Sequence, residues 1–295
     1  MNGVRRLARM TLICSAPDRL ADFYIAALGF EPVGDEPIVE PAFAALTGIA
    51  GATARTVTLQ YGEQRIELTG IDPPGRPYPR GVSGPSLLFQ HFAIVVADTS
   101  AAYDRLLSHG GAAAISRDGP QTLPASSGGV TAYKFRDPDG HPLELIAFPR
   151  GKGAAGIDHS AISVADTARS VEFYRRLGLR RSGCSLNRGP EQDRLDGMSG
   201  AVVAVTALAP PASSRPHVEL LCYRNGAAPP SAPPQTNDVA ATRLVLTVSD
   251  HAALNALCTQ NAEAVLSGPV QFEGGVRRAL LRDPDGHLLC LETPP

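Results

Sequence analysis

The stretch RDPDGHPLELIAFPRGKGAAGIDHSAISVAD, residues 136–166, joins a turn, a strand, a glycine linker and a second strand. Its DPDG segment at 137–140 has the chemistry of a type I turn, because proline presets φ, aspartate side chains bond nearby amides, and glycine accepts the left-handed conformation. The strand after the turn carries Glu144, and the strand after the linker carries His159. Two potential metal ligands therefore flank one turn-and-linker unit.

The turn belongs to a pattern that repeats along the chain. RDPDGH returns at 282–287, where the apolar strand LLCLE follows it, and ADFYIAALGF at 21–30 matches SVEFYRRLGL at 170–179. The FY pairs begin at 23 and 173, a spacing of 150, and the DPDG turns begin at 137 and 283, a spacing of 146. Such similar spacings indicate that a two-unit chain was duplicated.

Each unit has the pattern of a strand, a helix and about three further strands. The third unit shows it best, with a strand at 162–164, Asp166 as the helix N-cap and Gly178 as the helix stop. Pairs of strand candidates follow the four helices, at 56–60 and 65–69, 130–135 and 143–147, 201–208 and 217–223, and 276–281 and 288–292. The pattern occurs four times and predicts an α+β protein.

These four units, called modules below, predict two domains. Residues 1–150 hold modules at about 7–70 and 87–149, and residues 151–295 hold modules at about 156–223 and 239–294. Two Pro-rich stretches, at 71–86 and 224–238, are expected to be ordinary linkers between the modules of each domain.

Composition excludes several classes of function. The chain has 295 residues, 43% hydrophobic and 19% charged, which is enough for two domains with their own cores. A formal net charge of -2, a pI near 6.4 and the lack of a basic run argue against a nucleic-acid partner. The five scattered cysteines have no CxxC spacing, which favours a reducing, cytoplasmic location. Arg9 interrupts the apolar start, so we expect a strand there, and nothing approaches a membrane span.

Four strand-helix-three-strand modules, the FY and LG signature and a DPDG turn before LEL resemble the vicinal oxygen chelate superfamily. This superfamily includes glyoxalase I, extradiol dioxygenases and bleomycin resistance proteins, and the resemblance covers nearly the whole chain. It implies four βαβββ modules that form two cupped mixed β-sheets with helices outside. It also implies metal ligands at one position on the first strand and one on the last strand of each module.

Carried over to this chain, those positions differ between modules. The second module has His91 and Glu144, and the third has His159 and Glu219. The first has Arg9 and Glu67, and the fourth has Arg243 and Cys290, with Glu292 two residues farther on. The resemblance therefore implies a metal site made of His91, Glu144, His159 and Glu219.

The distribution of ligands also predicts which modules pair. If the second module pairs with the third, one cup receives two histidines and two glutamates and the other receives no complete set. If the first pairs with the second and the third with the fourth, each cup has an incomplete set with an arginine beside it. Two imidazoles and two carboxylates neutralise a divalent cation, whereas a guanidinium repels one, so we favour the first arrangement.

Each of these residues also has an ordinary structural role to consider. A strand histidine is commonly a core or edge residue, and a strand glutamate commonly faces solvent. Here apolar residues stand on both sides of Glu144 and Glu219. If those neighbours face the helices, the alternation of a strand turns the two glutamates into the cup.

The remaining histidines are weaker candidates. His217 shares a strand face with Glu219 and is a possible substitute ligand, although a surface role is expected. His141 and His287 follow the two DPDG turns and are expected to be exposed.

Other chemistry finds little support. Lys134 is adjacent to a turn and Lys152 lies in the linker, which disfavours amine catalysis by either lysine. Cys290 is expected to be a packed, unreactive strand cysteine. The GxGxxG match at 151–156 is followed by a strand and not by a helix, so we interpret it as a linker.

Four protein ligands leave room for two substrate oxygens at an octahedral ion, which suits a Lewis acid working with a general base. Glu144 or Glu219 would be that base, as the glyoxalase resemblance implies. The predicted function is a glyoxalase-like lyase or isomerase that needs a divalent metal, Ni, Zn, Mn, Co or Fe, and acts on a small oxygen-chelating metabolite. An extradiol-type dioxygenase and a non-catalytic drug-binding or resistance protein are the alternatives. A duplicated chain is expected to be a monomer or a homodimer.

Overall fold

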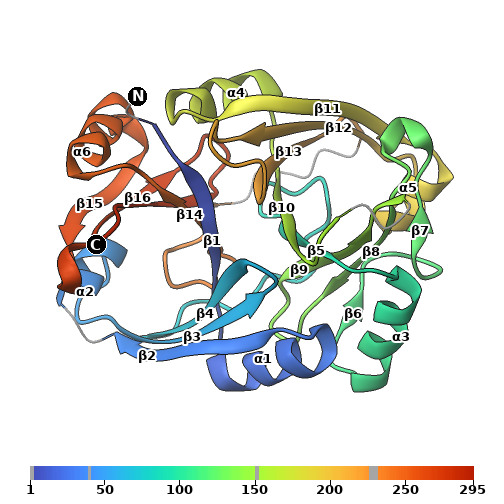
Figure 1. The fold of residues 1–295 in the computed structure, drawn as a ribbon, viewed down its shortest axis with the longest axis horizontal. Helices are drawn as coiled ribbons and strands as arrows, with labels where there is room; N and C mark the ends of the chain where they lie inside the picture. The colour runs from blue at the N-terminus through green and yellow to red at the C-terminus, as the bar shows by residue number, and fades with distance from the viewer. Residues whose placement is uncertain (1–2, 39–40, 150–152, 226–231) are drawn as a thin grey trace.

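The chain forms two curved β-sheets that lie side by side, with the longer helices packed against them (Figure 1). The computed structural model describes residues 3–38, 41–149, 153–225 and 232–295. The predicted domain division between 150 and 151, and the first two residues of the 151–156 linker, lie outside the described residues. Within the described ranges, no helix has both the length and the apolar character needed to cross a membrane.

One sheet combines the first and fourth modules, and we call it the outer-module sheet. Its strand order is β15 (Val265–Gln271), β16 (Arg277–Arg282), β17 (Leu288–Glu292), β14 (Arg243–Thr247), β1 (Arg6–Ile13), β4 (Gln64–Asp72), β3 (Thr53–Tyr61) and β2 (Glu31–Ile38). The other combines the second and third modules, and we call it the inner-module sheet. Its order is β11 (Arg180–Arg188), β12 (Val202–Ala209), β13 (His217–Tyr223), β10 (Gly156–Ser163), β5 (Gln90–Val95), β9 (Pro142–Ala147), β8 (Thr131–Arg136) and β6 (Ala113–Ala114), with β7 (Gln121–Thr122) on β8.

The helices follow the predicted plan. The first helix of each module is α1 (Pro17–Phe23), which continues as a wider turn over Tyr24–Leu28, α3 (Thr99–His109), α4 (Thr167–Arg176) and α6 (His251–Gln260). Asp98, Asp166 and Asp250 cap three of these helices by accepting hydrogen bonds from backbone amides of the first turn. Two short helices were not predicted, α2 (Pro41–Thr47) and α5 (Pro190–Leu195).

The module pairing that the ligand distribution predicted is the one observed. β5 pairs with β10 in antiparallel fashion and joins the second module to the third. β1 pairs with β14 in the same way and joins the first module to the fourth. Each sheet therefore has one concave face built from a module of each sequence half.

Strand alternation separates the core from these concave faces. Leu143 and Leu145 are buried in the main core, together with Val218 and Leu220. The glutamates between them, Glu144 and Glu219, line a cavity on the opposite face of the sheet. The predicted inward orientation of both glutamates is confirmed.

The FY and DPDG signatures bind each other across modules. The Tyr24 hydroxyl lies 3.1 Å from the Asp137 carboxylate, and the Tyr174 hydroxyl lies 3.1 Å from that of Asp283. Both tyrosines are fully buried. Each FY helix is thus fastened to the turn of the next module, which explains why the two motifs recur at nearly the same spacing.

The histidines after these turns are buried, so the predicted exposure of His141 and His287 is wrong. His141 has Nδ1 2.8 Å from Asp137 and Nε2 2.9 Å from the carbonyl oxygen of Ile13. His287 has Nε2 2.9 Å from the carbonyl oxygen of Ser163. Each histidine is buried because the first strand of the preceding module covers the turn. Local sequence does not predict packing between modules.

Candidate metal centre

Four neighbouring strands of the inner-module sheet, β13, β10, β5 and β9, bring the predicted metal ligands to one concave face. Glu219, His159, His91 and Glu144 lie on these strands in that order, and all four line a cavity of about 360 Å³. We call this face the histidine cup. Three of the residues are at least nine-tenths buried: His91 is 3% exposed, Glu144 5% and His159 5%.

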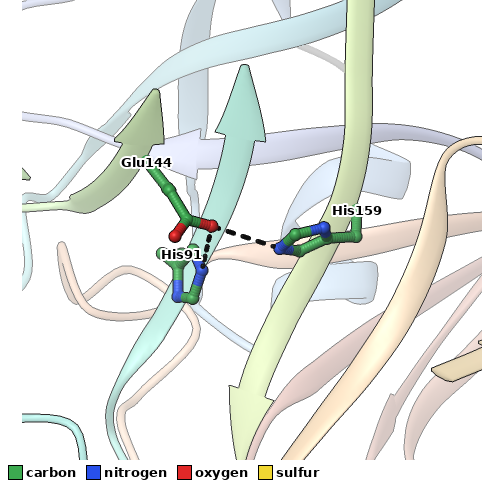
Figure 2. Close-up of side chains that lie close together, drawn as sticks. All are labelled: His91, Glu144 and His159. Atoms are coloured by element: carbon green, nitrogen blue, oxygen red, sulfur yellow. Dashed lines mark hydrogen bonds and ion pairs between the residues drawn. The ribbon is translucent and has the colours of Figure 1, made fainter. Parts of the chain in front are cut away.

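Three of the four side chains form a tight cluster (Figure 2). His91 Nε2 lies 3.3 Å from Glu144 Oε2, and His159 Nε2 lies 3.5 Å from the same oxygen. One ligand atom from each of the three residues falls within 4.8 Å of the others. Glu219 stands at the edge of the cluster, with Oε2 3.7 Å from His159 Nε2.

A β-bulge places a third acidic group behind His159. In the pairing of β10 with β5, Ile157 faces Ile94 and Ser160 faces Phe92, so Asp158 and His159 together oppose a single residue. A bulge turns adjacent side chains toward the same region. Both residues consequently line the cup, and Asp158 Oδ2 lies 3.0 Å from His159 Nδ1.

Asp158 was missed by the sequence reasoning, because strand alternation places consecutive residues on opposite faces. The structure also gives His217 a more definite role than the predicted surface one, since its Nε2 lies 3.4 Å from Glu219 Oε1. Asp158 could have been found from its position directly before His159, because the histidines that bind metals commonly donate a hydrogen bond to a carboxylate.

The surroundings of the two histidines shift their pKa values in opposite directions. Burial lowers the pKa of His91, although the contact with Glu144 opposes the effect. For His159, burial is outweighed by the charge of Glu219 and by hydrogen bonds to Asp158 and Glu144, so its pKa is raised well above the ordinary value. For Glu144, burial is outweighed by its hydrogen bonds to His159 and His91, and its pKa is lowered well below the usual range. The carboxylates of the cup are thus ionised, and their negative charge attracts a cation.

These residues fit a divalent cation. Two imidazoles and one or two carboxylates form a donor set that first-row divalent metals accept. His91 presents Nε2 to Glu144, so this nitrogen is the one placed to bind an ion, while its Nδ1 is buried without a hydrogen-bond partner among the described residues. Asp158 supplies the carboxylate that metal-binding histidines usually have on their second nitrogen.

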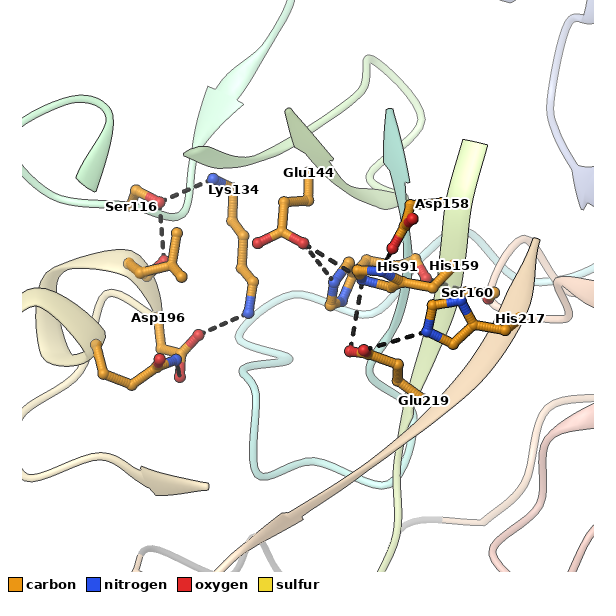
Figure 3. Close-up of polar contacts among 12 residues, drawn as sticks. His91, Ser116, Lys134, Glu144, Asp158, His159, Ser160, Asp196, His217 and Glu219 are labelled. Carbon is orange, nitrogen blue, oxygen red and sulfur yellow. Dashed lines mark hydrogen bonds and ion pairs between the residues drawn. The ribbon is translucent and has the colours of Figure 1, made fainter. Parts of the chain in front are cut away.

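The wall of the cup opposite the histidines carries a buried ion pair (Figure 3). Lys134 Nζ lies 2.7 Å from Asp196 Oδ1, and both residues are 5% exposed. Burial would lower the pKa of Lys134, but the charges of Asp196 and Glu144 outweigh it and raise that pKa. Lys134 is therefore a cation in the cup wall. From the sequence, Lys134 was placed only beside a turn. Its partner Asp196 could not be recognised, because it directly follows α5, which was not predicted.

The outer-module sheet has the same positions with different residues. Its bulge lies between Leu7 and Arg9 on β1, so Arg9 corresponds to His159 in both place and local geometry. Arg243 faces Thr11 across the two central strands, as His91 faces Ala161 in the other sheet. We call this concave face the arginine cup. Among the described residues, it contains no group of three His, Cys, Asp or Glu side chains close enough to hold a metal.

Paired βαβββ modules form a cupped sheet around the histidine and glutamate cluster, and comparison with known proteins names the family. The model of the Glyoxalase/Bleomycin resistance protein/Dioxygenase superfamily matches residues 6–145 and 156–291. The chain belongs to this superfamily, and the fold predicted from sequence is confirmed.

The individual proteins that resemble this chain share less than a third of its residues in the matched regions. Lactoylglutathione lyase GLX1 of Arabidopsis thaliana is 29% identical over 167 residues, which are 55% of this chain and 51% of that protein. The match thus spans about half the length of this curated relative. The crystal structure of glyoxalase I from Zea mays superposes with a TM-score of 0.66 at 18% identity, over 98% of this chain and 92% of the maize chain. A mutant of the maize protein gives a TM-score of 0.68, also at 18% identity and with the same coverage of both chains. The structural likeness shows a shared fold.

Proposed function

We propose that this protein is a divalent-metal-dependent lyase or isomerase of the glyoxalase type, acting on a small metabolite with two neighbouring oxygens. The observation that carries the proposal is the buried cluster of His91, Glu144 and His159, with Glu219 at its edge, inside a cavity of ligand size. The Arabidopsis relative, a lactoylglutathione lyase by name, supports the class of reaction.

His91, Glu144 and His159 would hold the ion, with Glu219 as a fourth ligand. When bound, the ion supplies a Lewis acid that polarises a substrate oxygen. Asp158 accepts a hydrogen bond from His159 Nδ1. With an ion bound, this contact would keep the ring proton on Nδ1 and leave Nε2, the nitrogen that faces Glu144, as the ligand atom. The donor set suits Ni, Zn, Mn, Co or Fe and does not select among them.

Glu219 is the better candidate for the general base, a role for which it would detach from the ion. Its side chain is 21% exposed, whereas that of Glu144 is 7% exposed and lies between two histidines. A base has to reach the substrate and carry a proton away, which needs freedom that Glu144 lacks. His217, 3.4 Å from the other oxygen of Glu219, can keep the carboxylate oriented during the transfer. Lys134 would provide a fixed positive charge near the substrate.

Proton exchange tests this mechanism without requiring the natural substrate. The protein loaded with Ni²⁺ would be incubated in D₂O with small α-hydroxyketones and α-dicarbonyl compounds, and loss of carbon-bound protons would be followed by NMR. Formation of lactoylglutathione from glutathione and methylglyoxal would be measured in parallel. We expect exchange with at least one compound, and loss of that exchange in Glu219→Gln but not in Glu67→Gln, the matched change in the arginine cup. Metal binding without exchange on any compound would count against the lyase and isomerase classes.

A dioxygenase is the second candidate, because the tight cluster contains two histidines and one carboxylate, the ligand set of many non-haem iron oxygenases. Anaerobic loading with Fe(II), followed by addition of catechols and oxygen, separates the two candidates. Our proposal expects no oxygen uptake. If added divalent metals do not change the melting temperature at all, the third reading, a non-catalytic binding protein, replaces both.

A further inference from the structure

The arginine cup contains a cavity of its own, of about 320 Å³. Both charged and apolar side chains line it. The charged ones include Arg9, Glu67, Arg243 and Arg278, and the apolar ones include Phe43, Leu46, Val245, Phe272, Val276 and Cys290. A concave site with a few polar groups among apolar ones is typical of small-molecule pockets.

Two of the three arginines are already paired with carboxylates. Arg9 Nε lies 2.5 Å from Glu67 Oε1, and its two terminal nitrogens lie 2.8 Å from the oxygens of Glu292. Arg278 Nε lies 2.8 Å from Glu292 Oε2. Thr11 donates a hydrogen bond of 2.6 Å to the second oxygen of Glu67. Glu67 and Glu292 therefore have little capacity left for another cation.

Arg243 is the third arginine and forms no ion pair with a described residue. It is 5% exposed, its terminal nitrogen donates a 2.7 Å hydrogen bond to the carbonyl oxygen of Thr236, and its Nε has no partner among the described residues. Burial of an ionised group is unfavourable unless a counter-charge accompanies it. Cys290 does not supply that charge, since burial raises the pKa of its thiol to about 11.

The mouth of the cavity limits what can enter. Glu36 and Glu273 are exposed residues that line it, and their negative charge opposes ligands with several negative charges. The apolar walls favour a ligand with an apolar body. A single carboxylate on such a body meets both conditions and pairs with a guanidinium in a planar, two-point geometry.

We propose that the arginine cup is a second, metal-free binding site that takes a small monocarboxylate with an apolar body, its carboxylate held by Arg243. The site belongs to a different sheet from the candidate metal centre and does not depend on the function proposed above.

Benzoate is the probe for the test, and isothermal titration calorimetry of the full chain treated with chelator is the measurement. We expect saturable binding of benzoate, at least about tenfold weaker binding in Arg243→Met, and unchanged binding in Arg180→Met, an exposed arginine outside the cup. His159→Ala should bind benzoate like the unaltered protein, which separates this site from carboxylate binding in the histidine cup.

Two further ligands extend the test to the unaltered protein, so it remains decisive even if Arg243→Met fails to fold. Benzamide has the shape of benzoate without its charge and should bind at least about tenfold more weakly. Inorganic phosphate should also bind more weakly than benzoate. Equal binding of benzamide, tighter binding of phosphate, or full benzoate affinity in a folded Arg243→Met would each overturn the proposal.

Discussion

The two cups are built on the same strand positions but obtain their positive charge in different ways. In the histidine cup, His91, Glu144 and His159 converge and leave ionised carboxylates in need of a cation. In the arginine cup, the guanidinium of Arg9 lies between Glu67 and Glu292, where it provides the cation within the chain itself. One cup is thus suited to a cation from solution, whereas in the other Arg9 already supplies the cation for both carboxylates.

The two cups differ by only a few residues at corresponding strand positions. The bulge that turns His159 and Asp158 into one cup is repeated at Arg9 in the other, where alanine precedes the arginine. A guanidinium cannot act as a metal ligand, since it has no lone pair to donate and repels the ion. Three of the four ligand positions differ, with Arg9 and Arg243 in place of the two histidines and Cys290 in place of Glu144, while the pairing of the central strands is the same.

The largest expected effect is a loss of metal affinity that is confined to changes in the histidine cup. His159→Ala removes one ligand and should weaken Ni²⁺ binding by more than about 100-fold, because loss of only an outer-shell partner costs about 10–100-fold. Arg9→Ala, the same position in the arginine cup, should leave Ni²⁺ affinity unchanged. Isothermal titration calorimetry gives both affinities, and a crystal structure with the ion beside Glu67 would contradict the assignment.

The second effect concerns the internal cation of the arginine cup. Burial of Glu292 is outweighed by its contacts with Arg9 and Arg278, which lower its pKa to about 2. Because this folded-state pKa lies below the unfolded value, the stabilisation is complete above about pH 4.3 and is lost as pH falls through about 2. Glu292→Gln should lower the free energy of unfolding by about 3 kcal/mol at pH 7.

Urea unfolding from pH 7 to pH 2 measures this change. The difference between Glu292→Gln and the unaltered protein should shrink toward low pH, whereas Glu31→Gln, at an exposed residue of β2, should show little difference at any pH. A deficit in Glu292→Gln that stays constant across the range would disprove the role of this carboxylate.

A smaller effect tests the bulge. Asp158→Asn removes the charge behind His159 and should weaken Ni²⁺ binding by about 10–100-fold, since outer-shell carboxylates orient the ligand ring and raise its basicity. Asp104→Asn, at an exposed position of α3, is the matched control and should leave the affinity unchanged. An unchanged affinity in Asp158→Asn would mean that His159 needs no such support.

Much of the fold could be read from periodicity and repeats. The strands expected at 217–223 and 288–292 are observed at those bounds, and helix caps such as Asp166 lie where predicted. The first of the three strands after each helix, such as β11, was harder to locate because most of its residues are exposed and alternate weakly. The helices α2 and α5 carried a signal that was overlooked, a proline at or near the first helical position.

The candidate site was only partly readable from sequence. His91, Glu144 and His159 were predicted as ligands because the resemblance to the superfamily implies one ligand position on the first and one on the last strand of each module. Lys134 and Asp196 were not recognised as a pair, because they lie 62 residues apart on different modules. Contacts of this kind depend on how modules pack, and no local pattern encodes them.

The sequence by itself determined the four modules, the inward faces of their strands and the presence of two histidines and two glutamates in the middle half of the chain, because these follow from local periodicity and duplication. Only the tertiary structure decided that Asp158 supports His159, that His141 and His287 are buried, and that Arg243 is left without an ionic partner among the described residues. Those facts depend on a bulge, on packing between modules and on which charges are already paired. Each is a property of side chains from distant segments meeting in space.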